Sequence, residues 1–293
     1  MKSKIVLSIL VSFTLSACMS STSMQDKASI TSNVDIDALQ KIVTQRPAEL
    51  QARDKYRNPV QTLAFFKVEP GMTVGEVLPG GGWYTRIIAD YLGTDGTLYA
   101  VNYNDDMWAR FGFFPEEFIA EQVAAMDQFP DLVKTFTDNG VAARGFTFAS
   151  VPDEVSGTLD RVLFIRAMHN LNRFEAEAGT RSQALQATYN MLKPGGMVGV
   201  VQHRLQEDAT NDKADGSRGY LKQSDVIEMF EEAGFKLLAK SEINANPKDQ
   251  PNADDVVWRL PPSMNGTGDD PEKREMVLAI GESDRMTLLF KKK

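Results

Sequence analysis

Three consecutive glycines, at positions 80 to 82, come directly after a short apolar segment and before an amphipathic one. Such a run lets the backbone turn sharply, adopt positive φ angles and approach a ligand with no Cβ in between. Residues 73–77 fit a strand, whereas residues 85–92 carry apolar side chains at helical spacing and end before Gly93. The free N–H groups at the start of that helix are suited to ligand binding. The stretch predicts a strand, turn and helix of an α/β fold, and a tight turn that binds nothing is the alternative.

Strands and helices alternate along the rest of the chain. A helix from Asp35, a mostly helical stretch over residues 105–139, and helices near residues 181–192 and 225–233 are predicted, the last capped by Ser224. The remaining predicted strands are residues 96–103, 145–148, 159–165, 197–201, 235–243 and 285–290. This alternation favours right-handed βαβ units and therefore a doubly wound, mostly parallel sheet.

The composition fits one domain behind an N-terminal extension. The chain has 293 residues, 42% of them hydrophobic, which is enough to bury a sizeable core. Its 40 acidic and 32 basic residues give a net charge of −8 without a basic block, so no nucleic-acid partner is expected. No metal site is expected, because Cys and His form no cluster. The domain is predicted to span residues 35–293, with residues 244–282 as a long loop or lid.

A dense polar segment precedes the glycine turn. It includes Arg53, Asp54, Tyr56 and Arg57. Because exposed charge runs are usually solvated, the simplest interpretation is a solvated helix face with an Asp–Arg pair.

The two histidines of the chain, His169 and His203, both follow predicted strands. In an open parallel sheet, ligands bind beyond the carboxyl ends of the strands, where the glycine turn and Asn102 are also expected. Each histidine is therefore either a candidate general base or a structural residue at the sheet edge.

Residues 1–17 have the form of a secretory signal peptide, with Lys2 and Lys4 ahead of an apolar core. Leu15-Ser16-Ala17-Cys18 resembles the lipobox of bacterial lipoproteins, in which the cysteine is acylated. The resemblance implies lipidation of Cys18, a flexible tether over residues 18–34, and, because Met19 replaces an Asp, an outer-membrane anchor facing the periplasm. An ordinary signal with an incidental cysteine is one alternative. Translation from Met24, which gives a cytoplasmic protein, is another.

Glu76 to Gly82, His169 after its strand, and Leu192-Lys193-Pro194-Gly195-Gly196 together resemble class I S-adenosylmethionine-dependent methyltransferases. Further similarity to a group of bacterial methyltransferase-like proteins lies in Arg53 to Arg57, Pro79 to Thr85, His169-Asn170-Leu171 and Ser283-Asp284-Arg285. The resemblance covers about residues 45–292. It implies a Rossmann-like methyltransferase fold with a seven-stranded sheet and an antiparallel last strand.

The resemblance also implies S-adenosylmethionine as cofactor. Glu76 matches the acid of the Glu/Asp-x-Gly-x-Gly-x-Gly pattern, and Gly80 and Gly82 match its last two glycines, whereas Leu78 replaces the first. Asn102 stands where an acid usually grips the ribose. The implied cofactor-binding set is completed by two further residues of the turn, Gly81 and Tyr84.

The chemistry follows from that assignment. A sulfonium methyl passes in line to a nucleophile, so catalysis needs positioning and a base, for which His169 and His203 are the candidates. No Asn/Asp-Pro-Pro-Tyr element occurs, which favours a small-molecule or lipid-like acceptor over nucleic-acid bases. The alternative is an envelope lipoprotein that uses the same fold as a non-catalytic binding module.

Overall fold

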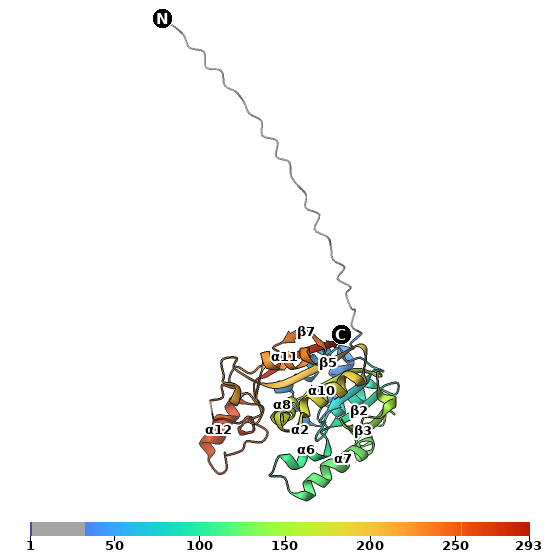
Figure 1. Cartoon of the computed structure of the whole chain (residues 1–293), viewed down its shortest axis with the longest axis horizontal. Coiled ribbons are helices and arrows are strands. Elements are labelled where there is room, and N and C mark those ends of the chain that lie inside the picture. The colour runs from blue at the N-terminus through green and yellow to red at the C-terminus, as the bar shows by residue number, and fades with distance from the viewer. Residues whose placement is uncertain (2–32, 253) are drawn as a thin grey trace. The chain divides into compact units, whose positions relative to one another are not determined.

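The computed structural model describes Met1, residues 33–252 and residues 254–293. The predicted signal peptide, the acylation site at Cys18 and most of the predicted tether lie outside these residues. Residues 33–252 and 254–293 belong to one compact unit (Figure 1).

The described residues form one eight-stranded sheet with the order β3-β2-β1-β4-β5-β8-β7, and β6 pairs with the end of β5. Strands β1 to β6 pair in parallel, whereas β8 runs antiparallel to both β5 and β7. The strands are β1 Thr73–Val77, β2 Thr97–Asn102, β3 Ala142–Thr147, β4 Leu159–Ile165, β5 Leu192–Leu205, β6 Leu221–Lys222, β7 Phe235–Ser241 and β8 Arg285–Lys292. This confirms the predicted doubly wound, mostly parallel sheet with an antiparallel last strand.

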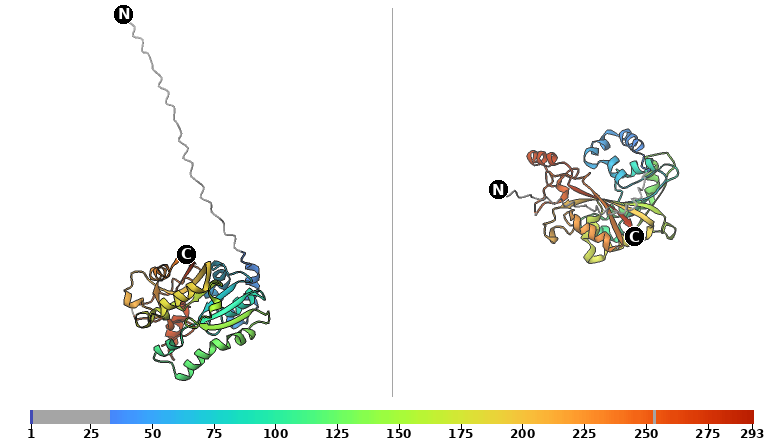
Figure 2. Two further views of the ribbon diagram at one scale, coloured as in Figure 1. Left: turned by 45° about the vertical axis from the view of Figure 1, so that its right-hand side comes forward. Right: turned by 90° about the horizontal axis from the view of Figure 1, so that it is seen from above.

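Helices pack on both faces of the sheet (Figure 2). The α-helices are α1 Ile36–Gln45, α2 Ala48–Gln51, α3 Asp54–Arg57, α4 Pro59–Phe65, α5 Thr85–Leu92, α6 Asp105–Arg110, α7 Glu116–Lys134, α8 Met168–Arg173, α9 Glu175–Ala178, α10 Thr180–Met191, α11 Gln223–Glu232 and α12 Pro271–Ile280. Short 3-10 helices are η1 Asp153–Val155, η2 Asn211–Lys213 and η3 Val257–Arg259. Within the described ranges, no helix is long and apolar enough to cross a membrane.

Two hydrophobic cores lie on opposite faces of the sheet, because successive side chains of a strand point to opposite sides. In β4, Val162 and Phe164 join the core under α8, α10 and α11. Leu163 and Ile165 join the core under α1, α4, α5 and α7. Both faces are therefore covered, as parallel sheets require.

Two local predictions differ from the structure. Ser224 is not a helix cap, because α11 begins at Gln223 and the Ser224 hydroxyl is hydrogen-bonded to Glu207 instead. Residues 244–282 are not all loop, since they contain η3 and α12, whose N-cap Asp270 accepts a hydrogen bond from the backbone of Lys273. The predicted N-cap Asp35 is confirmed, because its carboxylate accepts a hydrogen bond from the backbone of Ala38.

Candidate active site at the carboxyl ends of β1, β4 and β5

The turn after β1 has an open face. Gly80 and Gly82 have φ of 55° and 75°, and Leu78 has φ of 53°, a left-handed conformation that non-glycine residues rarely adopt. Leu78 thus follows a backbone path that glycine would take without strain. A Cβ at Gly80 or Gly81 would meet no atom within 4 Å, whereas one at Gly82 would lie 2.5 Å from the Phe136 ring. The backbone of positions 80 and 81 is therefore accessible to a ligand.

The other predicted cofactor residues are engaged within the chain. Thr85 Oγ1 donates a 2.7 Å hydrogen bond to the buried Glu76 carboxylate, which ties α5 to β1. The hydroxyl of the buried Tyr84 donates to the carbonyl of Arg57. Asn102 Oδ1 accepts from the backbone N–H of Tyr103 at 2.8 Å. Their contacts with a cofactor stay predictions.

A polar contact spans the edge above β1. The Asn170 carboxamide donates to the Tyr103 hydroxyl at 3.3 Å, which joins the segment after β4 to the segment after β2. Asn170 Oδ1 is buried and has no hydrogen-bond partner among the described residues. An unpartnered buried acceptor is costly, so this oxygen is suited to receive a donor from a ligand.

The two histidines lie side by side, with ring centroids 5.4 Å apart. His169 Nδ1 is 3.2 Å from Gln202 Oε1, and because the Gln202 amide nitrogen donates to Gly219, the imidazole is the donor in this contact. His203 Nδ1 is 2.6 Å from Ser283 Oγ.

Both imidazoles are neutral at pH 7. Burial lowers the pKa of His169 to about 4, although the hydrogen bond with Gln202 works in the opposite direction. Burial, His169 and the nearby arginines lower the pKa of His203 well below its ordinary value. A neutral imidazole keeps a lone pair, but a strongly lowered pKa makes it a weak base.

Next to the histidines lies an arginine cluster, which we define as Arg53, Arg57, Arg166 and Arg285 with Glu282. The carboxylate of Glu282 is 2.7 Å from Arg53 Nε, 3.2 Å from Arg57 Nε and 3.2 Å from Arg285 Nη1. The side chains of Arg57, Arg285 and Glu282 are only 2%, 3% and 5% exposed. Three guanidinium groups, those of Arg53, Arg57 and Arg285, therefore share one buried carboxylate.

Several donors in this cluster have no acceptor. Arg53 Nη2, Arg57 Nη1 and Arg285 Nε are buried without a hydrogen-bond partner in the described parts of the chain. The Arg166 side chain forms no hydrogen bond or ion pair with any described residue. Its backbone φ is 61°, a strained value directly after β4. Burial, together with Arg57 and Arg285, lowers the pKa of Arg166 to about 9, so it is charged at pH 7.

Arg166 and His203 line a cavity of about 150 Å³. Glu282 and Ser283 form part of the wall, and the remaining lining residues, all from the segment before α12, are Val257, Trp258, Leu260, Pro261, Pro262 and Ser263. Strand β8 runs antiparallel to β5, so its beginning reaches the edge at which β4 and β5 end. The cavity thus lies at the carboxyl edge of the sheet.

The wall segment is fastened to the domain by Asp249, whose side chain is fully buried. Its carboxylate accepts hydrogen bonds from Arg259 Nη2 at 2.8 Å, from the Tyr220 hydroxyl at 3.1 Å and from the backbone N–H of Asp284 at 3.0 Å. This anchor joins the part of the segment around Arg259 to the residues that precede β6 and β8.

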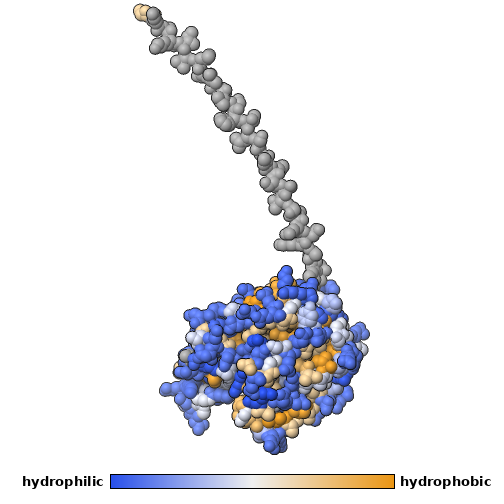
Figure 3. Space-filling model, in the orientation of Figure 1, coloured by the Kyte–Doolittle hydropathy of each residue, from blue (hydrophilic) through white to orange (hydrophobic). Residues whose placement is uncertain are grey.

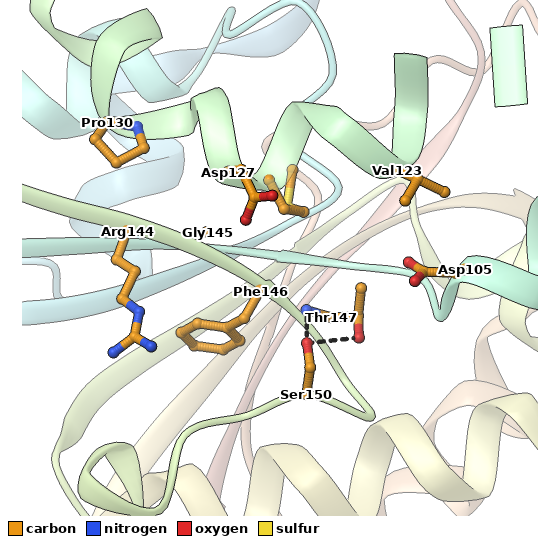
Figure 4. Close-up of a pocket in the computed structure, with 10 residues that line it drawn as sticks. Asp105, Val123, Asp127, Pro130, Arg144, Gly145, Phe146, Thr147 and Ser150 are labelled. Atoms are coloured by element: carbon orange, nitrogen blue, oxygen red, sulfur yellow. Dashed lines mark hydrogen bonds between the residues drawn. The ribbon is translucent and has the colours of Figure 1, made fainter. Parts of the chain in front are cut away.

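A larger cavity, about 460 Å³, lies along the edge strand β3 rather than at the glycine turn (Figure 4). Asp127 and Val123 on α7 face Phe146 and Thr147 of β3 across it, and the Ser150 hydroxyl is hydrogen-bonded to Thr147. The space-filling view shows an indentation of the surface between the region of α12 and the region of α6 and α7 (Figure 3). Phe113, which lies between α6 and α7 in the sequence, is 65% exposed.

The polar segment before the turn is not a solvated helix face. Asp54 pairs with Arg46, as expected of an Asp–Arg pair, but Arg57 is buried, and both Arg46 and Arg57 stack on the Trp83 ring at 4.7 and 4.6 Å. Burial of Arg57 is possible because Glu282, far along the chain, supplies the counter-charge.

The sequence matches no protein-family model, and no match was found among curated proteins. Solved structures with similar folds include a SAM-dependent methyltransferase from Aquifex aeolicus, with 18% identity, 72% of this chain and 94% of that chain covered and a TM-score of 0.46. The [4+2]-cyclase SpnF is 14% identical, with 83% of this chain and 82% of that chain covered and a TM-score of 0.49. A third similar structure is that of 1,6-didemethyltoxoflavin-N1-methyltransferase from Burkholderia thailandensis with bound 1,6-didemethyltoxoflavin and S-adenosylhomocysteine. It is 10% identical, with 88% of this chain and 86% of that chain covered and a TM-score of 0.44. Similarity at this level does not transfer an activity.

Proposed function

We propose that the chain is an S-adenosylmethionine-dependent methyltransferase that acts on a small-molecule or lipid-like acceptor. The observation that carries the proposal is the open backbone of Gly80 and Gly81 at the carboxyl end of β1, beside the point where the sheet order reverses between β1 and β4. In open α/β sheets this crevice is the usual ligand site.

The residues present fit such a cofactor. Gly80 and Gly81 leave room where a Cβ would otherwise stand, and Asn170 offers a buried acceptor without a partner across the same edge. When bound, S-adenosylmethionine supplies an electrophilic methyl group on a positively charged sulfur. The chain's own task is to place the acceptor in line with that methyl and to receive the acceptor's proton.

His203 is the better placed of the two candidate bases. It lines the cavity next to Arg166, whereas His169 does not line it and hydrogen-bonds to Gln202 in the interior. Because the pKa of His203 is well below its ordinary value, it suits an acceptor whose proton is already acidic. We assign to His169 the role of packing against His203 and holding its position.

Calorimetric titration with S-adenosylhomocysteine tests the proposal, and a dissociation constant in the micromolar range is expected. Gly80→Leu should weaken binding at least about tenfold, because the new side chain fills the open face. Gly157→Leu is the matched control, since Gly157 also has positive φ (68° against 55°) and open space, but it precedes β4 at the opposite edge. Gly81→Leu, at a position without positive φ, repeats the test without backbone strain.

The non-catalytic alternative makes a different prediction. A binding module would take up the ligand without transferring the methyl group, so incubation with methyl-labelled S-adenosylmethionine and a small-molecule cell extract would label no product. Absence of heat at millimolar S-adenosylhomocysteine would reject the methyltransferase proposal itself.

A further inference from the structure

The arginine cluster has four positively charged groups, which is more than the single negative charge of Glu282 can balance. Arg53, Arg57 and Arg285 occupy both oxygens of Glu282. Arg166 forms no ion pair with a described residue, whereas Glu282 is already paired with the other three arginines. Nitrogens of Arg53, Arg57 and Arg285 are buried without a hydrogen-bond partner among the described residues. Because uncompensated buried positive charge is costly, the cluster is suited to be completed by an anion.

The place for that anion is the 150 Å³ cavity. Arg166 and Glu282 line it, whereas Arg57 and Arg285, which have buried unpartnered nitrogens, are paired with Glu282 and do not line it. Trp258, Leu260 and Pro262 contribute apolar surface to the lining of the same cavity. A ligand that matches both kinds of surface combines an anionic group with an apolar body.

The cavity belongs to the half of the sheet that lies beyond the glycine turn. Its lining residues come from the ends of β4 and β5, the start of β8 and the wall segment, and none comes from the β1–α5 turn. This placement assigns the anion to the acceptor rather than to the carboxylate of the cofactor.

We propose that the methyl acceptor is a small anion, a carboxylate or phosphate with an apolar body, whose anionic group is bound by Arg166 in front of the arginine cluster. This inference rests on the proposed function. It names the class of acceptor that the same site takes, and places the acceptor's body between His203 and Trp258.

Benzoate is a suitable probe, with benzamide as its neutral isostere. Titrated calorimetrically into the protein with saturating S-adenosylhomocysteine, benzoate is expected to bind at least about tenfold more tightly than benzamide, because a charge-assisted contact with Arg166 is lost in the amide. Arg166→Gln should abolish this preference and Arg166→Lys should keep part of it. Arg274→Gln is the control, since Arg274 is exposed on α12 and the charge change is the same.

Three outcomes overturn the inference: equal affinities for benzoate and benzamide, a benzoate affinity that Arg166→Gln leaves unchanged, or a loss of S-adenosylhomocysteine affinity in Arg166→Gln without benzoate binding by the wild type. The last outcome would assign the subsite to the cofactor's carboxylate. If S-adenosylhomocysteine does not bind at all, the proposed function fails, whereas benzoate titrated into the protein alone still tests the anion site. Melting temperatures of the variants separate a binding defect from misfolding.

Discussion

At the scale of single residues, burial has opposite consequences for two carboxylates. Burial alone would raise the pKa of Glu282, but Arg57, Arg285 and Arg53 together lower it. Glu76 has no cation beside it, so burial raises its pKa to about 7, against a smaller opposite effect of the Thr85 hydroxyl. Glu282 is therefore ionised at neutral pH, whereas Glu76 is close to its titration midpoint.

Glu76→Gln should change the pH dependence of stability. The pKa of Glu76 is about 7 in the folded chain and has its ordinary value of 4.5 in the unfolded chain. Between these two pH values the folded chain keeps a proton that the unfolded chain has lost. The wild type therefore loses stability as pH rises from 4.5 to 7. The glutamine side chain introduced by this substitution cannot ionise but can accept the hydrogen bond from Thr85. Relative to the wild type, Glu76→Gln should therefore gain about 3 kcal/mol between pH 5 and pH 8.

Urea denaturation at the two pH values measures this difference. Glu272→Gln, at an exposed position of α12, controls for the removal of one carboxyl group. An equal stability difference between Glu76→Gln and the wild type at both pH values would contradict the assignment of the shift to Glu76.

How far the site could be predicted depends on whether its residues are neighbours in the sequence. The glycine turn is local, and its position after β1 was predicted from the glycines and the flanking periodicity. The arginine cluster joins Arg57, Arg166 and Glu282 from three distant segments. Nothing in the sequence near Arg57 indicates its counter-charge, so a solvated face was the simpler interpretation. A dense arginine segment together with Arg166 at a strand end was the available signal.

At the scale of elements, residues 257–263 contribute to the cavity lining next to a buried ionic anchor, the pair of Asp249 and Arg259. Asp249 connects Arg259 on η3 with Tyr220 before β6 and with the backbone before β8. The length of the segment predicted a loop or lid. The anchor, however, depends on two contacts of Asp249, one with a residue 29 positions away and one with a residue 35 positions away. Hydrophobic periodicity does not reveal contacts between residues so far apart in the sequence.

Asp249→Asn should loosen this segment. The variant keeps one acceptor oxygen but leaves Arg259 without its strongest counter-charge, and breaking a buried ion pair costs about 3 kcal/mol or more. Limited proteolysis should then cut within residues 250–280 at least about tenfold faster than in the wild type, while the core fragment persists. Asp254→Asn changes an exposed position of the same segment, and this variant should be cleaved at the wild-type rate. Unchanged cleavage in Asp249→Asn would mean that packing alone holds the segment.

At the scale of the whole molecule, the alternation of strands and helices follows from features that the sequence displays well. The antiparallel last strand was implied by the resemblance to methyltransferases, and the strand order is known from the structure. Strands that are buried on both faces appear in the sequence as continuous apolar segments. A helix between two such strands is typical of a crossover that joins parallel strands. Local ends were less predictable, because tertiary contacts decide them: Ser224 gives its hydroxyl to Glu207 rather than to the helix. The location of the protein in the cell is predicted from the sequence of its N-terminal residues.

We propose that Cys18 is acylated and anchors the chain to the envelope. Cys18 is the one cysteine of the sequence and follows Leu15-Ser16-Ala17 behind an apolar segment. Labelling of cells with an alkyne fatty acid should mark the full-length protein, and Cys18→Ser should lose the label entirely.

Met24→Leu distinguishes the two translation starts: labelled protein of unchanged amount is expected, because initiation at Met1 includes the signal. If Met24→Leu abolishes the protein and the wild type carries no label, translation begins at Met24 and the chain meets S-adenosylmethionine in the cytoplasm, where its supply needs no transport across a membrane.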